Sequence, residues 1–244
     1  MASLGLVEKQ QMKLYLIPIP LAEETVEQVL PIQIQEVVAE VDTFFVENIR
    51  TARRFISSLK LGKVIDDLTF YELSKDTPEA ETLKQLKTAV THRKNIGVMS
   101  EAGCPGIADP GAVAVKIAHQ LGIETVPLVG PSSILLALMA SGMNGQSFVF
   151  HGYLPIEKEE RNKALQQLSK EAKTKQQTQI FIETPYRNNV LFEAILEVCP
   201  PDLILCVACD ITAKTQFIKS LSIQKWKSSP KPELHKRPTV FLLV

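Results

Sequence analysis

The sequence predicts an α/β protein of two halves, with a mainly parallel sheet in the N-terminal half and a mixed sheet in the C-terminal half. Along the 244 residues, short apolar runs alternate with stretches of helical periodicity, as in a sheet that helices cover on both faces. After Gly130 this pattern starts again, and its late strands crowd together. We therefore expect domains at 1–128 and 129–244, with 1–11 as a frayed extension.

The N-terminal half begins with a strand at 14–20, which must stop pairing near Pro18 and Pro20 because proline donates no ladder hydrogen bond. In 49–59 the apolar residues recur at helical spacing. Pro78 suits the first turn of a helix at 76–91. The other expected elements of this half are helices at 23–30 and 111–121 and strands at 41–48, 68–74, 96–99 and 124–130.

The C-terminal half is expected to open with an apolar helix at 134–140. A long charged helix follows at 157–175, and a further helix at 189–198. The segment 227–238 has the composition of a loop. Strands are expected at 147–155, 178–185, 203–211, 215–222 and 238–244.

The composition narrows the class of protein. Lys+Arg and Asp+Glu number 27 each, so no overall basic field indicates nucleic acid, although a local patch can exist in a neutral chain. No apolar run reaches the roughly 18 residues of a membrane span, and the N-terminus lacks a secretory pattern, so we expect a cytoplasmic protein. Cys206 and Cys209 form a lone C-x-x-C pair inside an apolar run, which favours buried thiols. The four histidines are scattered, so the sequence predicts no metal site.

Familiar nucleotide and hydrolase motifs are missing from the sequence. No G-x-G-x-x-G follows the first strand, and neither G-x-x-x-x-G-K-[ST] nor G-x-S-x-G occurs. Four loops of small residues remain, each at a strand end: 18–21, 100–111, 130–133 and 182–185. Small residues let a backbone approach a ligand closely, and ligands of open α/β sheets lie at the carboxyl ends of strands. A mostly apolar cradle of this kind suits a nucleoside-like cofactor.

Several of these segments resemble one known family. The stretches SEAGCPGIADPG (100–111), GIETVPLVGPSSILLALMASGM (122–143) and FVFHGYLP (148–155) closely resemble the tetrapyrrole-methylase superfamily, the class III S-adenosylmethionine-dependent methyltransferases. VENIRTARRF (46–55) and FIETPYR (181–187) are similar to two motifs of the branch that methylates a ribose 2′-hydroxyl of small-subunit ribosomal RNA. The resemblance covers about 12–244.

The sequence also departs from that branch. PIPLAEE (18–24) replaces the usual P-I-G-N-L, and Glu101 stands where aspartate is usual. Asn48 and Ile49 replace an Asp-Thr pair, and Ala108 replaces serine. The acceptor can therefore differ from that of the ribosomal RNA branch.

The resemblance implies a homodimer that binds S-adenosylmethionine in a cleft between its two halves. It further implies RNA as partner. By motif position, the implied cofactor-binding residues are Pro20, Leu21, Ser100, Gly103, Cys104, Pro105, Ile107, Ser132, Ser133, Ile182, Ala208 and Pro238.

The sulfonium of that cofactor is a strong electrophile, so the protein must align the acceptor and, for a hydroxyl, remove its proton. The candidate bases are Glu101, Glu47 and Asp109, in that order. Glu47 and Glu183 need partners near a cleft, for which Arg50 and Arg187 are available. The arginines expected to contact RNA are Arg50, Arg53, Arg161 and Arg187.

Simpler interpretations exist for several of these residues. Ser132 can cap the following helix, and Asp109 can be a turn former or helix cap. The arginines can form a solvated helix face. Two other functions also remain open: methylation of a tetrapyrrole or other small molecule, and a non-catalytic relative that only binds S-adenosylmethionine.

Overall fold

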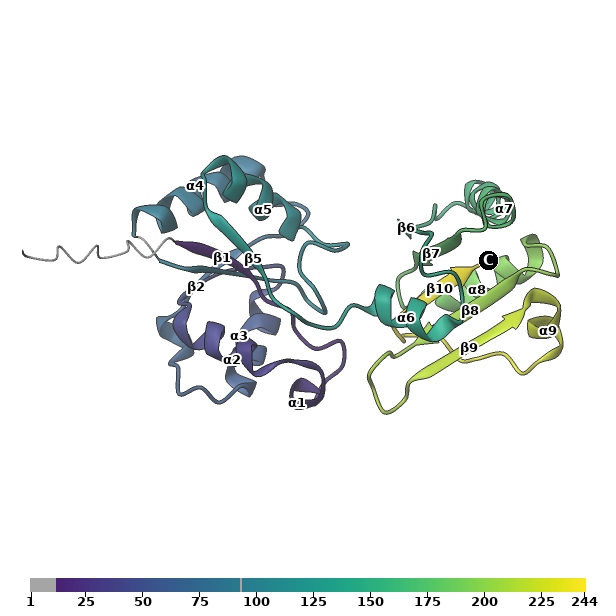
Figure 1. The fold of residues 1–244 in the computed structure, drawn as a ribbon, viewed down its shortest axis with the longest axis horizontal. Coiled ribbons are helices and arrows are strands. Elements are labelled where there is room, and N and C mark those ends of the chain that lie inside the picture. The colour runs from purple at the N-terminus through teal and green to yellow at the C-terminus, as the bar shows by residue number, and fades with distance from the viewer. Residues whose placement is uncertain (1–11, 93) are drawn as a thin grey trace, which may run out of the picture. The chain divides into compact units, whose positions relative to one another are not determined.

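The computed structural model describes residues 12–92 and 94–244, which divide into two compact units (Figure 1). Unit 1 contains 12–20 and 26–131, and unit 2 contains 21–25 and 132–244. The chain thus passes into unit 2 after Pro131, later than the boundary predicted after residue 128. No sequence signal predicted that 21–25 belongs with unit 2. The extension expected at 1–11 lies outside the described residues.

Unit 1 is built on a five-stranded sheet in the order β3-β2-β4-β1-β5, and all its pairs are parallel, as predicted. Five α-helices and a short 3-10 helix (Ile65–Asp67) connect these strands. The strands are β1 (Lys13–Leu16), β2 (Thr43–Val46), β3 (Thr69–Glu72), β4 (Ile96–Met99) and β5 (Glu124–Pro127), and the helices are α1 (Val26–Val29), α2 (Ile32–Glu40), α3 (Ile49–Ser58), α4 (Glu79–Thr91) and α5 (Gly111–Gln120).

The helices of unit 1 cover both faces of its sheet (Figure 1). One core cluster joins α2 and α3 to Phe44, and another joins α4 and α5 to Phe45. The connection that leaves β1 therefore turns to one face, and the connection that leaves the neighbouring β4 turns to the other. Such a point, where adjacent strands send their chains to opposite faces, is where open α/β sheets bind ligands.

Unit 2 contains a mixed five-stranded sheet in the order β6-β7-β10-β8-β9, as predicted. Only the β6–β7 pair is parallel. One face packs against α7, α8 and α9, and the other against α6. The strands are β6 (Phe148–Tyr153), β7 (Thr178–Ile182), β8 (Ile204–Cys209), β9 (Phe217–Ser222) and β10 (Thr239–Leu243), and the helices are α6 (Ser133–Ser141), α7 (Lys158–Lys175), α8 (Asn188–Val198) and α9 (Ile223–Ser228).

The structure adds two α-helices, α2 and α9, and the short 3-10 helix, none of which the sequence pattern predicted. The polar glutamines of α2 break up its apolar spacing, and α9 has only six residues. The segment 227–238, expected as a loop, is irregular after α9 but firmly anchored. Its Leu234 is fully buried, and the Leu234 N–H donates to Asn189 Oδ1 over 3.0 Å.

Candidate active site

The carboxyl ends of β1, β2, β4 and β5 meet at one edge of the unit 1 sheet. Backbone pairing continues past the strands, because Ile17 N donates to Val98 O at 2.9 Å and Leu128 N donates to Leu16 O at 3.1 Å. On the other side of β4, Glu47 N donates to Met99 O at 3.2 Å. The chain segments that leave these four strands are therefore neighbours.

The loop after β4 is tied to the loop after β1. Ile19 and Gly103 form an isolated antiparallel bridge, with N···O distances of 3.1 and 3.0 Å. Gly103 has φ +73°, a conformation that side chains disfavour. Gly103 is buried and both of its backbone groups are paired with Ile19, so its role is to hold the two loops together.

The loop after β5 joins the same edge. The Cys104 thiol lies 3.3 Å from the carbonyl oxygen of Pro131 and donates to it, and a Cβ on Gly130 would overlap the ring of Pro18. Burial raises the pKa of the Cys104 thiol, and Asp109 raises it further, so this thiol stays protonated near neutral pH. Three of the four predicted small-residue loops thus reach this edge of unit 1.

Glu47 is half-buried at this edge, and its Oε2 accepts a hydrogen bond from the backbone N–H of Glu101 at 3.1 Å. Burial raises the pKa of Glu47 above its ordinary value, against the lowering effect of that hydrogen bond. The carboxylates of Glu101 and Asp109 raise the pKa of Glu47 further. The protein therefore provides little stabilisation for the negative charge of ionised Glu47. A positively charged ligand nearby would stabilise that charge.

Asp109 organises the loop. Its Oδ1 accepts hydrogen bonds from the N–H groups of Gly106 at 2.8 Å and Gly111 at 2.6 Å, and the latter begins α5. Burial raises the pKa of Asp109, although these backbone donors lower it. The interpretation of Asp109 as a turn former is therefore confirmed, and its carboxylate is already engaged.

The remaining cofactor candidates of unit 1 differ in exposure. Ser100 is buried and donates its hydroxyl to the carbonyl oxygen of Ala102 at 3.1 Å. Pro105 is also buried, Pro20 is half-buried, and Ile107 has 54% of its surface exposed. Of these four side chains, that of Ile107 is the most accessible to a ligand.

The cofactor candidates of unit 2 gather near the sheet face that α6 covers. Leu21 and Ile182 pack at the margin of this core cluster. Ser132 occupies the N-cap position of α6, but its side chain makes no capping hydrogen bond, so the capping interpretation is wrong. Ser133 opens that helix, and the exposed Pro238 accepts a hydrogen bond through its carbonyl oxygen from Asp210 N at 2.9 Å.

Ala208, the last of these candidates, lies in the interior of the unit 2 sheet. It pairs with Val240 on one side and Ile218 on the other, and its side chain is fully buried. In this position the Ala208 side chain is covered by the chain itself.

Three of the four arginines expected to contact RNA are held by their own chain. Arg53 pairs with Asp66 and lies over the ring of Phe70. Arg161 is buried, and its Nη1 donates to the carbonyl oxygen of Ile156 at 3.0 Å, so its guanidinium is little accessible to RNA. Arg187 pairs with Glu183, as expected, and Arg50 is exposed.

The Glu183–Arg187 pair shapes the turn after β7. Glu183 is buried, and its Oε1 accepts from Arg187 Nη2 at 2.7 Å and from Thr184 N at 2.6 Å. Burial alone would raise the pKa of Glu183, but these hydrogen bonds lower it below its ordinary value. Glu183 is therefore ionised and engaged in holding this turn, and its lowered pKa makes it a poor base.

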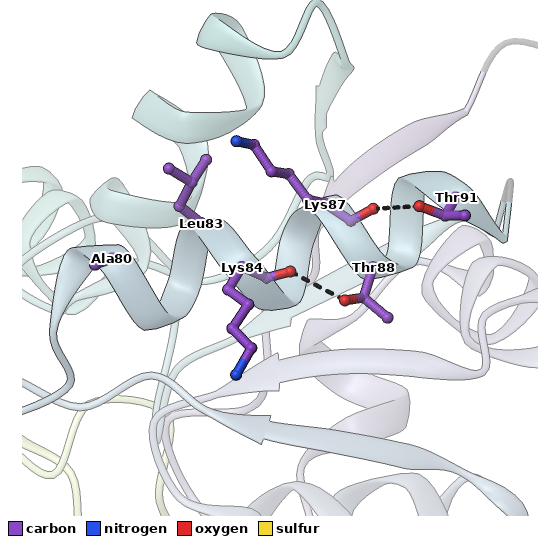
Figure 2. A pocket seen from close by; sticks show the side chains of 6 residues that line it. All are labelled: Ala80, Leu83, Lys84, Lys87, Thr88 and Thr91. Atoms are coloured by element: carbon purple, nitrogen blue, oxygen red, sulfur yellow. Dashed lines mark hydrogen bonds between the residues drawn. The ribbon is translucent and has the colours of Figure 1, made fainter.

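A hollow of about 420 Å³ lies along α4, on residues 80–91 (Figure 2). Figure 2 shows Thr88 and Thr91 bonded back to the carbonyl oxygens of Lys84 and Lys87, one turn earlier. The hollow is a feature of one helix surface and contains none of the predicted site residues. Among the described residues, no cluster of three or more His, Cys, Asp or Glu side chains has an arrangement that could hold a metal ion.

Solved structures with the same fold include two methyltransferases. The methyltransferase CobJ has a TM-score of 0.62 and 17% identity, and the match covers 96% of this chain and 93% of that one. Uroporphyrin-III C-methyltransferase from Thermus thermophilus has a TM-score of 0.54 and 15% identity, over 95% and 91% of the two chains. At these identities, the likeness shows the fold alone.

Sequence comparison identifies the family. No protein-family model matches the chain. The ribosomal RNA small subunit methyltransferase I of Bacillus subtilis (strain 168) is 31% identical over 207 residues, and the like-named proteins of Vibrio cholerae and Escherichia coli O157:H7 are 28% and 25% identical. These matches cover 84%, 86% and 97% of this chain, and 66%, 68% and 78% of the relatives. The chain belongs to the tetrapyrrole-methylase superfamily.

Other relatives of the same name match over a smaller part of their length. One from Buchnera aphidicola is 33% identical, and its match covers 62% of this chain and 52% of the relative. The matches thus span between about half and about three quarters of these relatives.

Proposed function

We propose that this chain transfers the methyl group of S-adenosylmethionine to a ribose 2′-hydroxyl of small-subunit ribosomal RNA. The observation that carries the proposal is the agreement among its sequence relatives, which bear one name, ribosomal RNA small subunit methyltransferase I, over most of this chain. The loops at the strand ends of unit 1 support the proposal that the chain binds S-adenosylmethionine. The carboxylates of the same unit support the proposal that it removes a proton from the acceptor.

The residues at this edge fit the cofactor. S-adenosylmethionine supplies a methyl group on a positively charged sulfur. Glu47 and Asp109 are half-buried carboxylates whose pKa values are raised chiefly by burial, so a cation placed nearby stabilises their ionised forms. Such a site favours a sulfonium over a phosphate-rich cofactor, which would meet like charges.

We assign the proton-accepting role to Glu47. The N–H of Glu101 holds its Oε2, which leaves Oε1 to accept the proton of an aligned hydroxyl. A raised pKa brings the Glu47 carboxylate closer to neutral pH and makes it a better base than an ordinary glutamate. Glu101 then acts through its backbone, and Asp109 holds the loop, which reverses the expected order of Glu101 and Glu47.

Methylation of small ribosomal subunits tests the proposal. A 2′-O-methyl group removes the nucleophile that cleaves RNA in alkali, so transfer from labelled S-adenosylmethionine should protect one phosphodiester. The cofactor alone should also raise Tm, because it binds the native state. Label in a tetrapyrrole and none in RNA would identify the small-molecule alternative. Cofactor binding without transfer to any acceptor would identify the non-catalytic one.

The family resemblance also underlies two further proposals, a homodimer and a cytoplasmic location. Light scattering of the purified chain would test the first, and fractionation of cells the second. None of the helices in the described part of the chain is both long and apolar enough to cross a membrane.

A further inference from the structure

Two exposed tyrosines lie at the ends of neighbouring strands in unit 2. The chain has four tyrosines, and Tyr15 and Tyr71 pack against the cores of unit 1. Tyr153 and Tyr186 are instead 58% and 68% exposed. Tyr153 ends β6, and Tyr186 lies in the turn after β7, the parallel neighbour of β6. Exposed rings that gather on one surface can mark an interaction site.

Features of the backbone fix the positions of Tyr153 and Tyr186. The β6–β7 register shifts between Phe150 and Tyr153, and Gly152 has φ +65°, so a bulge redirects the chain just before Tyr153. The Glu183–Arg187 ion pair closes the turn that carries Tyr186. Lys236 N donates to Pro185 O at 3.0 Å, which fixes the segment before β10 against this turn.

The surroundings of the tyrosines are basic and aromatic. The Lys236 ammonium lies 5.9 Å from the centre of the Tyr186 ring, and the His235 ring meets that ring edge-on at 5.9 Å. Tyr153 pairs with Ile182, the last residue of β7, so Tyr153 and the turn that carries Tyr186 lie at the same end of the β6–β7 pair. The acids Glu183 and Asp210 are each paired with an arginine, and Glu233 accepts hydrogen bonds from His235 N at 2.8 Å and from Asn189 Nδ2 at 3.1 Å.

We propose that Tyr153 and Tyr186 form a stacking surface for unpaired bases of an RNA, with Lys236 beside the phosphates. Single-stranded nucleic acid is bound in this way, by aromatic rings under successive bases and cations along the backbone. The charge of Lys236 favours an anionic polymer over an apolar protein partner. This inference rests on the proposed RNA acceptor and adds where, on unit 2, the unpaired bases bind.

The test compares a labelled oligoadenylate with an abasic RNA of equal length, because only the first can stack. Wild type should prefer the oligoadenylate, and Tyr186→Ala should weaken its binding roughly 5- to 100-fold. The abasic RNA should bind equally to both proteins. Tyr186→Phe should retain binding, whereas Tyr186→Leu should lose it, since stacking needs a ring. Met139→Ala removes an even more exposed apolar side chain from the same unit and should change nothing.

The outcomes separate the two proposals. If wild type methylates ribosomal RNA but Tyr186→Ala and Tyr153→Ala bind oligoadenylate normally, the stacking surface is wrong and the proposed function stands. If Tyr186→Leu binds the oligoadenylate as well as wild type, the contact does not need a ring and the stacking surface is wrong. If wild type binds neither RNA, and methylates none, the RNA acceptor is wrong and the stacking surface with it.

Discussion

At the scale of single residues, Glu47 combines a functional proposal with a cost in stability. The folded chain disfavours its ionised form, because burial raises its pKa. That cost is absent below the ordinary pKa of 4.5 and reaches its full value once the pH exceeds the folded pKa. Glu47 therefore stabilises the fold least at neutral pH, where a base is needed.

We predict that Glu47→Gln raises the free energy of unfolding at pH 8 by less than about 1 kcal/mol, since Glu47 keeps part of its solvation. The gain should vanish as the pH falls below 4.5. Methyl transfer should fall by about 10²- to 10⁴-fold, the usual loss for a general base. Denaturant unfolding across pH and single-turnover transfer measure the two effects. A variant that is less stable at pH 8, or fully active, contradicts the role given to Glu47.

At the scale of elements, α7 shows that a charged residue in a solvent-exposed helix can be buried and have a structural role. The sequence 157–175 is rich in charge, and most of its long side chains face solvent. Arg161 instead lies within the buried stripe of α7, with Leu165 and Leu168. The Arg161 side chain donates to the carbonyl oxygen of Ile156, just before the helix. Its role is to secure the start of the helix.

We predict that Arg161→Ala lowers the free energy of unfolding by about 1–3 kcal/mol, because it removes packing and leaves the Ile156 carbonyl unpaired. It should leave the salt dependence of RNA binding unchanged. The exposed Arg50 provides the comparison: Arg50→Ala should reduce the slope of log K against log salt by about 0.7 while leaving stability within about 0.5 kcal/mol. A reduced slope for Arg161→Ala would return this residue to the RNA-binding surface.

At the scale of the whole molecule, each unit has its own cores. Two hydrophobic clusters belong to unit 1 and two to unit 2. The single tryptophan, Trp226, is fully buried in unit 2 and donates through Nε1 to the carbonyl oxygen of Leu205 at 2.9 Å. Its fluorescence therefore reports the folding of unit 2.

We predict that the two units unfold separately. A Cβ at position 97 would lie 2.7 Å from Phe44 and 2.8 Å from Ile17, so Gly97→Ala should destabilise unit 1 by about 1–3 kcal/mol. The circular dichroism transition should shift to lower denaturant while the Trp226 fluorescence transition stays. Gly145→Ala, whose Cβ meets no atom within 4 Å, is the control. If both transitions move together for Gly97→Ala, the units unfold as one.

Much of the fold follows from local patterns. Apolar spacing predicted α3 and α5 within a residue of their ends, since a helix buries one stripe of its own sequence. The small residues after β4 predicted the end of that strand correctly, whereas β1 ends at Leu16, before the prolines that were expected to close it. The loop at 100–111 was identified from composition alone, because glycine and proline restrict the backbone wherever they occur.

The sequence by itself therefore determined the order of all the strands and most of the helices, the two α/β halves, the family and the loops of the candidate site. Only the tertiary structure decided that 21–25 joins unit 2, that Arg161 is buried, and that Glu47 receives the N–H of Glu101. Periodicity and turn chemistry act between residues a few positions apart. Burial and charge depend on neighbours such as Glu47 and Glu101, 54 positions apart in sequence, which come together only when the sheet forms.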